Sequence, residues 1–301
     1  MTPQNIKKIL KSDFPDLQIK TIKKIPEGWR NYVFLVNNSL IVRFPKQINP
    51  FIKIQKQVLQ KLSPKISYKL PTIHYINPTY CYSIYPAILA CSYTKFDFVN
   101  FTNTEKQRIS YDLANFLNQL HSAINLKELM DIGVPTFDYQ KEIEDIKTET
   151  KKFLKLNLDA QLKAFVESQA KIAVQHLSLS QKYLPVLLHN DLHIKNIILE
   201  CETKNLNGVI DFDDIKIGHY HLDFANLAFS LPFDIFLSIT QQYTKLTGRD
   251  VYLDYVFAIA TDYVASNLVK YPNNTKLWEE SIETLKEMNK IFMSKYLNCP
   301  T

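Results

Sequence analysis

The stretch Leu187–Asp211, LLHNDLHIKNIILECETKNLNGVID, decides the fold of this chain. Two short apolar runs, Pro185–Leu188 and Ile197–Leu199, flank a polar loop, and a third apolar run ends directly on Asp211. Short apolar runs bounded by polar residues are typical of buried strands. The segment is therefore predicted to form strand, loop, strand, turn and strand, with Gly208 closing the turn at positive φ.

Oxygen-bearing side chains lie at the ends of these strands. We expect Asp191, Asn196 and Asp211 to face one cleft, and Asp213 and Asp214 extend the acidic cluster. A carboxylate and a neutral amide oxygen are ligands that suit Mg²⁺. The protein would share this ion with phosphate oxygens of the substrate. Asp191 then remains to orient an attacking hydroxyl and accept its proton. This combination predicts phosphoryl transfer, in which positioning and charge neutralisation supply most of the rate.

The residues before this stretch have the pattern of a β-rich unit. Three β-branched or aromatic runs separated by turn residues predict a meander of hairpins over Leu17–Ile25, Tyr32–Val36 and Leu40–Phe44. A helix is predicted over Phe51–Leu62, and extended segments follow within Tyr82–Tyr93. The first part of the chain is thus expected to be a small sheet with one helix.

A helical period begins near residue 103. Apolar residues recur at spacings of three and four over Ile109–Leu120, and Thr104 is the predicted N-cap of this helix. Further helices are predicted over Phe137–Gln175 and Leu222–Tyr296. The second part of the chain is therefore expected to be larger and mainly helical.

Composition excludes several kinds of site. The chain has 5 glycines among 301 residues, about a quarter of the usual share. Nucleotide loops of the GxGxxG and GxxxxGKS types need several glycines close together, so a glycine-dense phosphate loop is excluded. The net charge of +6, without a long run of like charges, supports solubility rather than binding to nucleic acid or a membrane.

The cysteines predict a reducing compartment. Cys81, Cys91, Cys201 and Cys299 show no CxxC spacing, and no apolar leader follows a basic start. Neither secretion nor a disulfide framework is expected, and no apolar stretch approaches the ~18 residues of a membrane span. We expect a cytoplasmic monomer.

The deciding stretch resembles the catalytic and metal-binding loops of the protein-kinase-like fold. The motif carrying this resemblance is His189-Asn190-Asp191, followed after four residues by Asn196 and then by Ile210-Asp211-Phe212. It is most similar to the aminoglycoside phosphotransferase family, as are GWRNYVFLVNNSLIVRFPK near the N-terminus and Leu120-His121 after an apolar helix. The resemblance implies an α+β bilobal fold, with a nucleotide-binding lobe over residues 1–95 and a catalytic and substrate-binding lobe over residues 96–301.

The resemblance also implies roles for the central residues. Asp191 would be the catalytic base, with Asn196 and Asp211 as Mg²⁺ ligands and His189 as a structural support of the loop. Arg43 takes the place of the lysine that holds the nucleotide phosphates, and an arginine fork can bind phosphate in a bidentate manner. Asp223 resembles the family's structural aspartate.

Nucleotide contacts follow from the same resemblance. Gly28 would be the single glycine of the nucleotide loop. The link between the lobes is expected near Tyr93, where the backbone of Thr94 to Phe96 would bind the purine of ATP or GTP. A bulky Tyr93 would narrow the pocket for adenine and keeps GTP open as the donor.

One departure from the family pattern favours an alternative. A kinase-like helix presents a glutamate to the phosphate-binding cation, whereas the aligned residue here is Gln55, whose amide cannot form an ion pair. A nucleotide-binding module that has lost turnover is therefore the second hypothesis.

A metal-dependent hydrolase is the third hypothesis. It would use zinc held by His189, His193, His219 and His221, but the β-type runs around this loop do not favour a helical His-x-x-x-His site.

The acceptor is expected to be a small alcohol. An aminoglycoside is the first candidate, followed by macrolides, choline, homoserine and other metabolite alcohols. One predicted helix near the C-terminus carries a stripe of acidic residues. This stripe either binds a polycationic acceptor or is an ordinary solvated helix face. Its residues are Trp278, Glu279, Glu280, Glu283 and Glu287. The same two interpretations hold for Glu142, Glu144 and Asp145.

Overall fold

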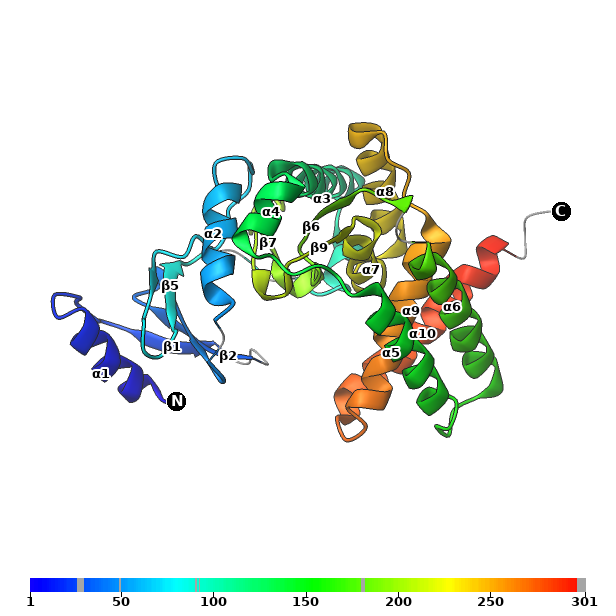
Figure 1. Cartoon of the computed structure of the whole chain (residues 1–301), viewed down its shortest axis with the longest axis horizontal. Helices are drawn as coiled ribbons and strands as arrows, with labels where there is room; N and C mark the ends of the chain where they lie inside the picture. Colours follow the sequence, from blue (N-terminus) through cyan, green and yellow to red (C-terminus); the bar gives the residue numbers. More distant parts are fainter. Residues whose placement is uncertain (26–29, 49, 90, 92, 180–181, 297–301) are drawn as a thin grey trace.

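A computed structural model describes residues 1–25, 30–48, 50–89, 91, 93–179 and 182–296 of the chain. It has a sheet-containing lobe at one end and a helical lobe at the other (Figure 1). The predicted α+β, bilobal fold class is thus confirmed.

The N-terminal lobe is built on a five-stranded antiparallel sheet with strand order β1-β2-β3-β5-β4. Its strands are β1 (Ile22–Ile25), β2 (Asn31–Val36), β3 (Leu40–Pro45), β4 (Tyr75–Ile76) and β5 (Ser83–Pro86). On β3, Val42 and Phe44 lie in the lobe's small core. Because successive side chains on a strand point to opposite faces, Arg43 between them points away from this core. Alternation alone therefore turns Arg43 out of the N-lobe interior.

Two helices accompany this sheet. Helix α1 (Pro3–Asp13) buries Ile6 and Leu10 against the N-lobe core and was not predicted. Helix α2 (Ile52–Leu62) agrees with the predicted helix and packs its Val58, Leu59 and Leu62 into the main core. Figure 1 shows α2 between the sheet and the helical lobe. It is therefore the N-lobe helix placed to contact both lobes.

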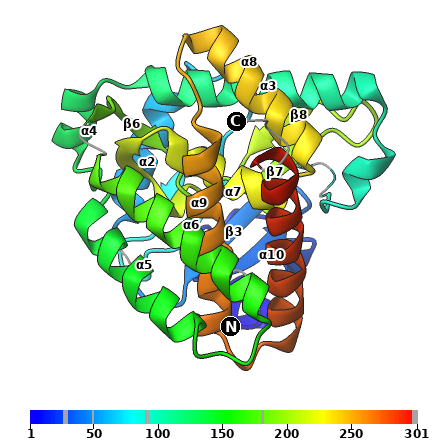
Figure 2. The ribbon, with the colours of Figure 1, turned by 90° about the vertical axis from the view of Figure 1, so that its right-hand side faces the viewer.

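The C-terminal lobe combines helices with two small β-ribbons. The helices are α3 (Asn103–Ala123), α4 (Leu126–Ile132), α5 (Tyr139–Phe153), α6 (Ala160–Ser178), α7 (His221–Ser230), α8 (Phe233–Thr247), α9 (Leu253–Lys270) and α10 (Thr275–Tyr296). The ribbons pair β6 (Pro185–Leu188) with β9 (Lys216–His219), and β7 (Ile197–Leu199) with β8 (Leu206–Val209). Helices α3 and α8 pack together, while α5, α6, α9 and α10 stack as a second group (Figure 2).

The start of α3 corrects one local prediction. Thr102, and not Thr104, is the N-cap, because its hydroxyl accepts from the Glu105 N–H while the Glu105 carboxylate accepts from the Thr102 N–H. This reciprocal pair is a capping box. The T-N-T-E sequence was the signal for it.

The predicted role of Gly208 is also wrong. Lys204, with φ of 59°, supplies the left-handed residue of the β7–β8 turn, and Gly208 is a strand residue of β8. A Cβ at Gly208 would lie 2.4 Å from the carbonyl oxygen of Lys69. The glycine is therefore needed because another backbone crosses close to it.

The cysteine spacing predicted no disulfide framework, but the described residues contain one disulfide. Cys91 and Cys201 form a disulfide. It connects the segment between the lobes to the turn that follows β7. Within the described residues, no helix is long and apolar enough to cross a bilayer.

Candidate active site

The loop between β6 and the 3₁₀ turn η3 (Ile194–Asn196) carries Asp191. Contacts of the His189 side chain hold this loop in place. The His189 ring is fully buried, its Nε2 lies 2.9 Å from the Ile210 carbonyl oxygen, and its Nδ1 lies 3.3 Å from the Asp191 N–H nitrogen. A neutral ring protonated on Nε2 satisfies both contacts. Burial lowers the pKa of His189, which favours this neutral form. The ring therefore ties the loop to the residue before Asp211.

Asp223 on α7 anchors the same loop. Its carboxylate accepts from the backbone N–H groups of His189 at 3.1 Å and Asn190 at 2.7 Å. His121 Nε2 on α3 lies 3.0 Å from the same carboxylate, and His121 Nδ1 lies 2.9 Å from the Tyr243 hydroxyl. Asp223 thus joins two helices to the loop that carries Asp191, which is the kind of structural contact that the resemblance implied.

Two residues of the site have left-handed backbone conformations. Asn190 has φ of 62° and Asp211 has φ of 65°. Such conformations cost on the order of 1 kcal/mol each outside glycine, and Asn and Asp tolerate them best. The buried contacts of His189 and Asp223 supply the structure that holds Asn190 in place.

Asp191 and Asn196 are in direct contact. Asn196 Nδ2 donates to the Asp191 carbonyl oxygen at 2.8 Å and approaches its Oδ2 at 3.3 Å. Burial, followed by the nearby carboxylates of Asp214 and Asp211, raises the pKa of Asp191 to about 7. A carboxylate with a pKa near neutrality is suited to general base chemistry at physiological pH.

His193 lies close to both Asp191 and Asn196, with its Nε2 3.4 Å from the Asn196 Nδ2. Its Nε2 is 3.6 Å from Asp191 Oδ1, and burial lowers the pKa of His193 to about 4. The ring is therefore neutral at neutral pH and does not form an ion pair with Asp191.

Asp211 and Asn196 fit a Mg²⁺ ion by the chemistry of their donor atoms. The Ile210 N–H donates to the Asn196 carbonyl oxygen at 2.9 Å, which places Asp211 one residue from this contact. The Asp211 side chain is 41% exposed. Since the Asn196 amide nitrogen faces Asp191, the amide oxygen is the atom left for a cation. Carboxylate and amide oxygens are hard ligands of the kind that Mg²⁺ prefers.

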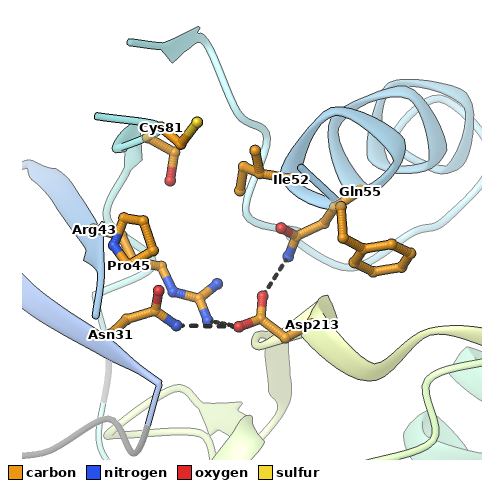
Figure 3. Close-up of a pocket in the computed structure, with 9 residues that line it drawn as sticks. Asn31, Arg43, Pro45, Ile52, Gln55, Cys81 and Asp213 are labelled. Atoms are coloured by element: carbon orange, nitrogen blue, oxygen red, sulfur yellow. Dashed lines mark hydrogen bonds and ion pairs between the residues drawn. The ribbon is translucent and has the colours of Figure 1, made fainter. Parts of the chain in front are cut away.

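Arg43 reaches this site from the N-lobe (Figure 3). One of its terminal nitrogens lies 3.0 Å from Asp211 Oδ1 and also contacts the Asp213 carboxylate. Gln55 Nε2 on α2 donates to Asp213 Oδ1 at 3.1 Å, and Asn31 Nδ2 donates to Asp213 Oδ2 at 3.1 Å. The pairing of Asp213 with Arg43 and Gln55 was not predicted, because these residues are far apart in the sequence.

Of the residues predicted to contact the nucleotide base and loop, the structure describes Thr94 and Phe96 but not Gly28. Thr94 lies in a turn, where its N–H donates to Asp97 Oδ2 at 2.6 Å and its carbonyl accepts from the Asp97 N–H at 3.1 Å. A purine that takes the Thr94 N–H must displace Asp97. The Phe96 side chain is exposed, and Gly28 lies outside the described residues. The purine contacts at Thr94 and Phe96 and the role of Gly28 stay predictions.

The histidines proposed for zinc do not converge. His189 binds the Ile210 carbonyl, and His219 Nε2 contacts the Tyr255 hydroxyl. In the part of the chain that the structure describes, no three His, Cys, Asp or Glu side chains gather as a metal-binding group.

Two acidic regions lie in the helical lobe. Burial, followed by the nearby Glu142 carboxylate, raises the pKa of Asp262 on α9 to about 8, and burial also raises the pKa of Glu142 on α5. Asp262 was missed because its sequence context is an ordinary apolar helix.

The acidic stripe on α10 contributes to a shallow groove of about 490 Å³, lined by Trp278, Glu279, Ile282, Glu283 and Lys286.

Comparisons with known proteins agree with this arrangement. The family model described as phosphotransferase enzyme family matches residues 21–254, which confirms the resemblance seen in the motifs. No curated protein sequence matches the chain.

Several solved structures share the fold. Aminoglycoside 2'-phosphotransferase-IIIa in its GDP complex is 22% identical, with a TM-score of 0.83 over 96% of this chain and 99% of that one. ADP-bound aminoglycoside phosphotransferase APH(2'')-Ib is 21% identical, with a TM-score of 0.66 over 97% and 99% of the two chains. Macrolide 2'-phosphotransferase MphH from Brachybacterium faecium is 15% identical, with a TM-score of 0.65 over 94% and 98%.

Proposed function

Because this chain belongs to the phosphotransferase enzyme family, we propose that it transfers the γ-phosphoryl group of ATP or GTP to a hydroxyl of a small molecule. Residues 1–95 form the nucleotide-binding lobe in this proposal, and residues 96–301 form the catalytic and substrate-binding lobe. An aminoglycoside is the first candidate for the acceptor.

The convergence of four side chains carries the proposal. Asp191 and Asn196 are in hydrogen-bond contact, and Arg43 reaches Asp211 from the opposite lobe at 3.0 Å. A base, two hard-oxygen ligands and a cation are the parts that phosphoryl transfer needs in one place.

Asp191 acts as the base in this mechanism. Its carboxylate orients the acceptor hydroxyl and takes its proton as the oxygen attacks phosphorus. The contact with Asn196 holds the carboxylate in one orientation, and the raised pKa makes it a better proton acceptor than an ordinary aspartate.

Asn196 and Asp211 would hold Mg²⁺, which when bound neutralises charge on the phosphate oxygens. Arg43 binds the phosphates of the nucleotide through its guanidinium fork. Because the Arg43 side chain is only 10% exposed, its charge is weakly screened by solvent and acts strongly on a phosphate.

The acceptor site is proposed near Glu142 and Asp262. Burial raises the pKa of Tyr263 well above its usual range, and the carboxylates that add to this shift are, in decreasing order, Glu142, Asp262, Asp223 and Asp191. The acidic pair and Asp191 are therefore all close enough to Tyr263 to act on its charge state. An amino group of a cationic acceptor would stabilise the ionised forms of both carboxylates, which favours an amino sugar over a neutral alcohol.

The test is a panel of aminoglycosides, macrolides and metabolite alcohols, assayed with ATP and with GTP in the presence of Mg²⁺. We expect phosphorylation of at least one cationic acceptor, and a loss of turnover of about 10²–10⁴-fold in Asp191→Asn, the range of general base catalysis. Thermal stability with nucleotide shows whether the variant still folds and binds.

Asp234→Asn is the control, because Asp234 pairs with Lys106 on the surface and its side chain is 61% exposed. Unchanged turnover in Asp191→Asn would remove the assigned base. Nucleotide binding without phosphorylation of any acceptor would instead favour the module that lacks turnover.

A further inference from the structure

The carboxylate of Asp213, in the 3₁₀ turn η4 (Phe212–Asp214), receives three side chains from the N-lobe (Figure 3). Arg43 contacts Oδ2, Asn31 donates to Oδ2 at 3.1 Å, and Gln55 donates to Oδ1 at 3.1 Å. The side chains of Arg43 and Asp213 are 10% and 19% exposed. Both carboxylate oxygens are therefore used in a partly desolvated contact between the lobes.

The identity of residue 55 follows from this contact. In kinase-like folds, the phosphate-binding cation of the N-lobe needs a carboxylate partner, which the N-lobe helix normally supplies. A glutamate at position 55 would place a second carboxylate against Asp213 at hydrogen-bond distance, where the like charges repel. The Gln55 amide instead donates a hydrogen to Asp213.

Resting on the phosphotransferase function proposed above, we propose that Asp213 is the positioning residue of Arg43 and takes over the charge that the helix α2 lacks. The ion pair then joins β3 of one lobe to η4 of the other, instead of staying within the N-lobe. Asp213 holds the guanidinium close to the phosphates through a contact that links the two lobes.

The arrangement also protects Asp211. Arg43 carries one positive charge, and Asp213 is its partner. Among the contacts of the described residues, Arg43 touches Asp211 only at Oδ1. Oxygen Oδ2 of Asp211 is thereby left to bind a cation. Without the Asp213 charge, Arg43 would pair more strongly with Asp211 and compete with the metal ion.

A carboxylate relocation tests the proposal. Asp213→Asn removes the charge and keeps the shape, Gln55→Glu adds a like charge, and the double variant Asp213→Asn with Gln55→Glu exchanges the amide and the carboxylate across one hydrogen bond. We expect each single variant to raise the KM or Kd for the nucleotide at least 10-fold. The double variant should recover to within about 3-fold of the parent, because position 55 then pairs with Arg43.

Glu128→Gln is the matched control. Glu128 on α4 pairs with Lys61 on α2, so this variant also removes an ion pair between α2 and the C-lobe, away from the site. It should change the nucleotide KM less than 2-fold. A parental KM in Asp213→Asn, or a double variant as weak as the sum of its single variants, would overturn the inference.

The parent, the two single variants and the double variant also distinguish a failure of this inference from a failure of the proposed function. If the parent binds no nucleotide, the function fails, but the coupling between positions 55 and 213 is still measurable as thermal stability. Both single variants should then lower the Tm and the double variant should restore it. Additive losses of Tm would reject the pairing whatever the activity is.

Discussion

At the residue scale, the site depends on side chains whose charge state is set by their surroundings. Asp191 and Asp262 both have their pKa raised above the usual aspartate range, chiefly by burial. Asp191 belongs to a motif that could be found from spacing alone. Asp262 carries no such signal, because its shift comes from α5 and α9 packing together.

Asp262 predicts a pH dependence of stability. Its folded-state pKa of about 8 lies above the ordinary value of 3.8, so the folded protein binds a proton that the unfolded chain has released at neutral pH. Its stability contribution is full below pH 4 and is lost as the pH rises toward 8. Between pH 5 and 7, the unfolding free energy of the parent should fall by about 3 kcal/mol more than that of Asp262→Asn.

Urea unfolding at several pH values measures this difference. Asp131→Asn is the control, because Asp131 is a surface residue paired with Lys127 and its side chain is 63% exposed. Its pH profile should follow that of the parent. Equal slopes for Asp262→Asn and the parent would contradict the shift.

At the scale of elements, most helices and strands could be predicted from period and turn residues. Helix α1 was missed although its sequence carries signals: Thr2 caps it, Pro3 stands in its first turn, and Ile6 and Leu10 recur at the helical spacing. For the two β-ribbons, the local pattern predicts a single series of neighbouring strands. Their separation arises because β6 pairs with the later strand β9, which a local pattern does not reveal.

Gly208 gives a prediction for the β7–β8 ribbon. Gly208→Ala should destabilise the protein by about 1–3 kcal/mol, because the new methyl group would overlap the Lys69 carbonyl and force the backbone to move. Chemical unfolding measures the loss. Gly248→Ala is the comparison, since Gly248 has φ of 71° and open space around it, and its cost of about 1 kcal/mol would come from φ alone. A fully stable Gly208→Ala would show that β8 can shift away from Lys69.

At the scale of the whole molecule, the links between the lobes include the chain itself, the disulfide Cys91–Cys201 and ion pairs such as Arg43–Asp213 and Lys61–Glu128. The disulfide joins residues 110 positions apart in the sequence. A cross-link over so long a loop restricts the unfolded chain strongly. Its place next to the link between the lobes makes it a constraint on their relative position.

Cys201→Ser should therefore lower the unfolding free energy by about 2–4 kcal/mol. Denaturant unfolding with and without a thiol reductant measures this effect. The reduced parent should match the variant, and the variant should not respond to reductant. Cys81→Ser is the control, because Cys81 is a free cysteine. A parent whose stability is the same in both conditions would contradict a structural role for the bond.

Local sequence was sufficient to predict the α+β class, the family and the polar loop that carries Asp191. Asp191 and Asn196 are five positions apart, and the strand pattern around them restricts the backbone enough to bring them together. Tertiary structure alone decided that Asp213 partners Arg43 and Gln55, that Lys69 crosses Gly208, and that Cys91 meets Cys201. The physical reason is that local spacing limits only neighbours in the chain, whereas the partner of a buried charge depends on which distant side chain the fold places within hydrogen-bond distance.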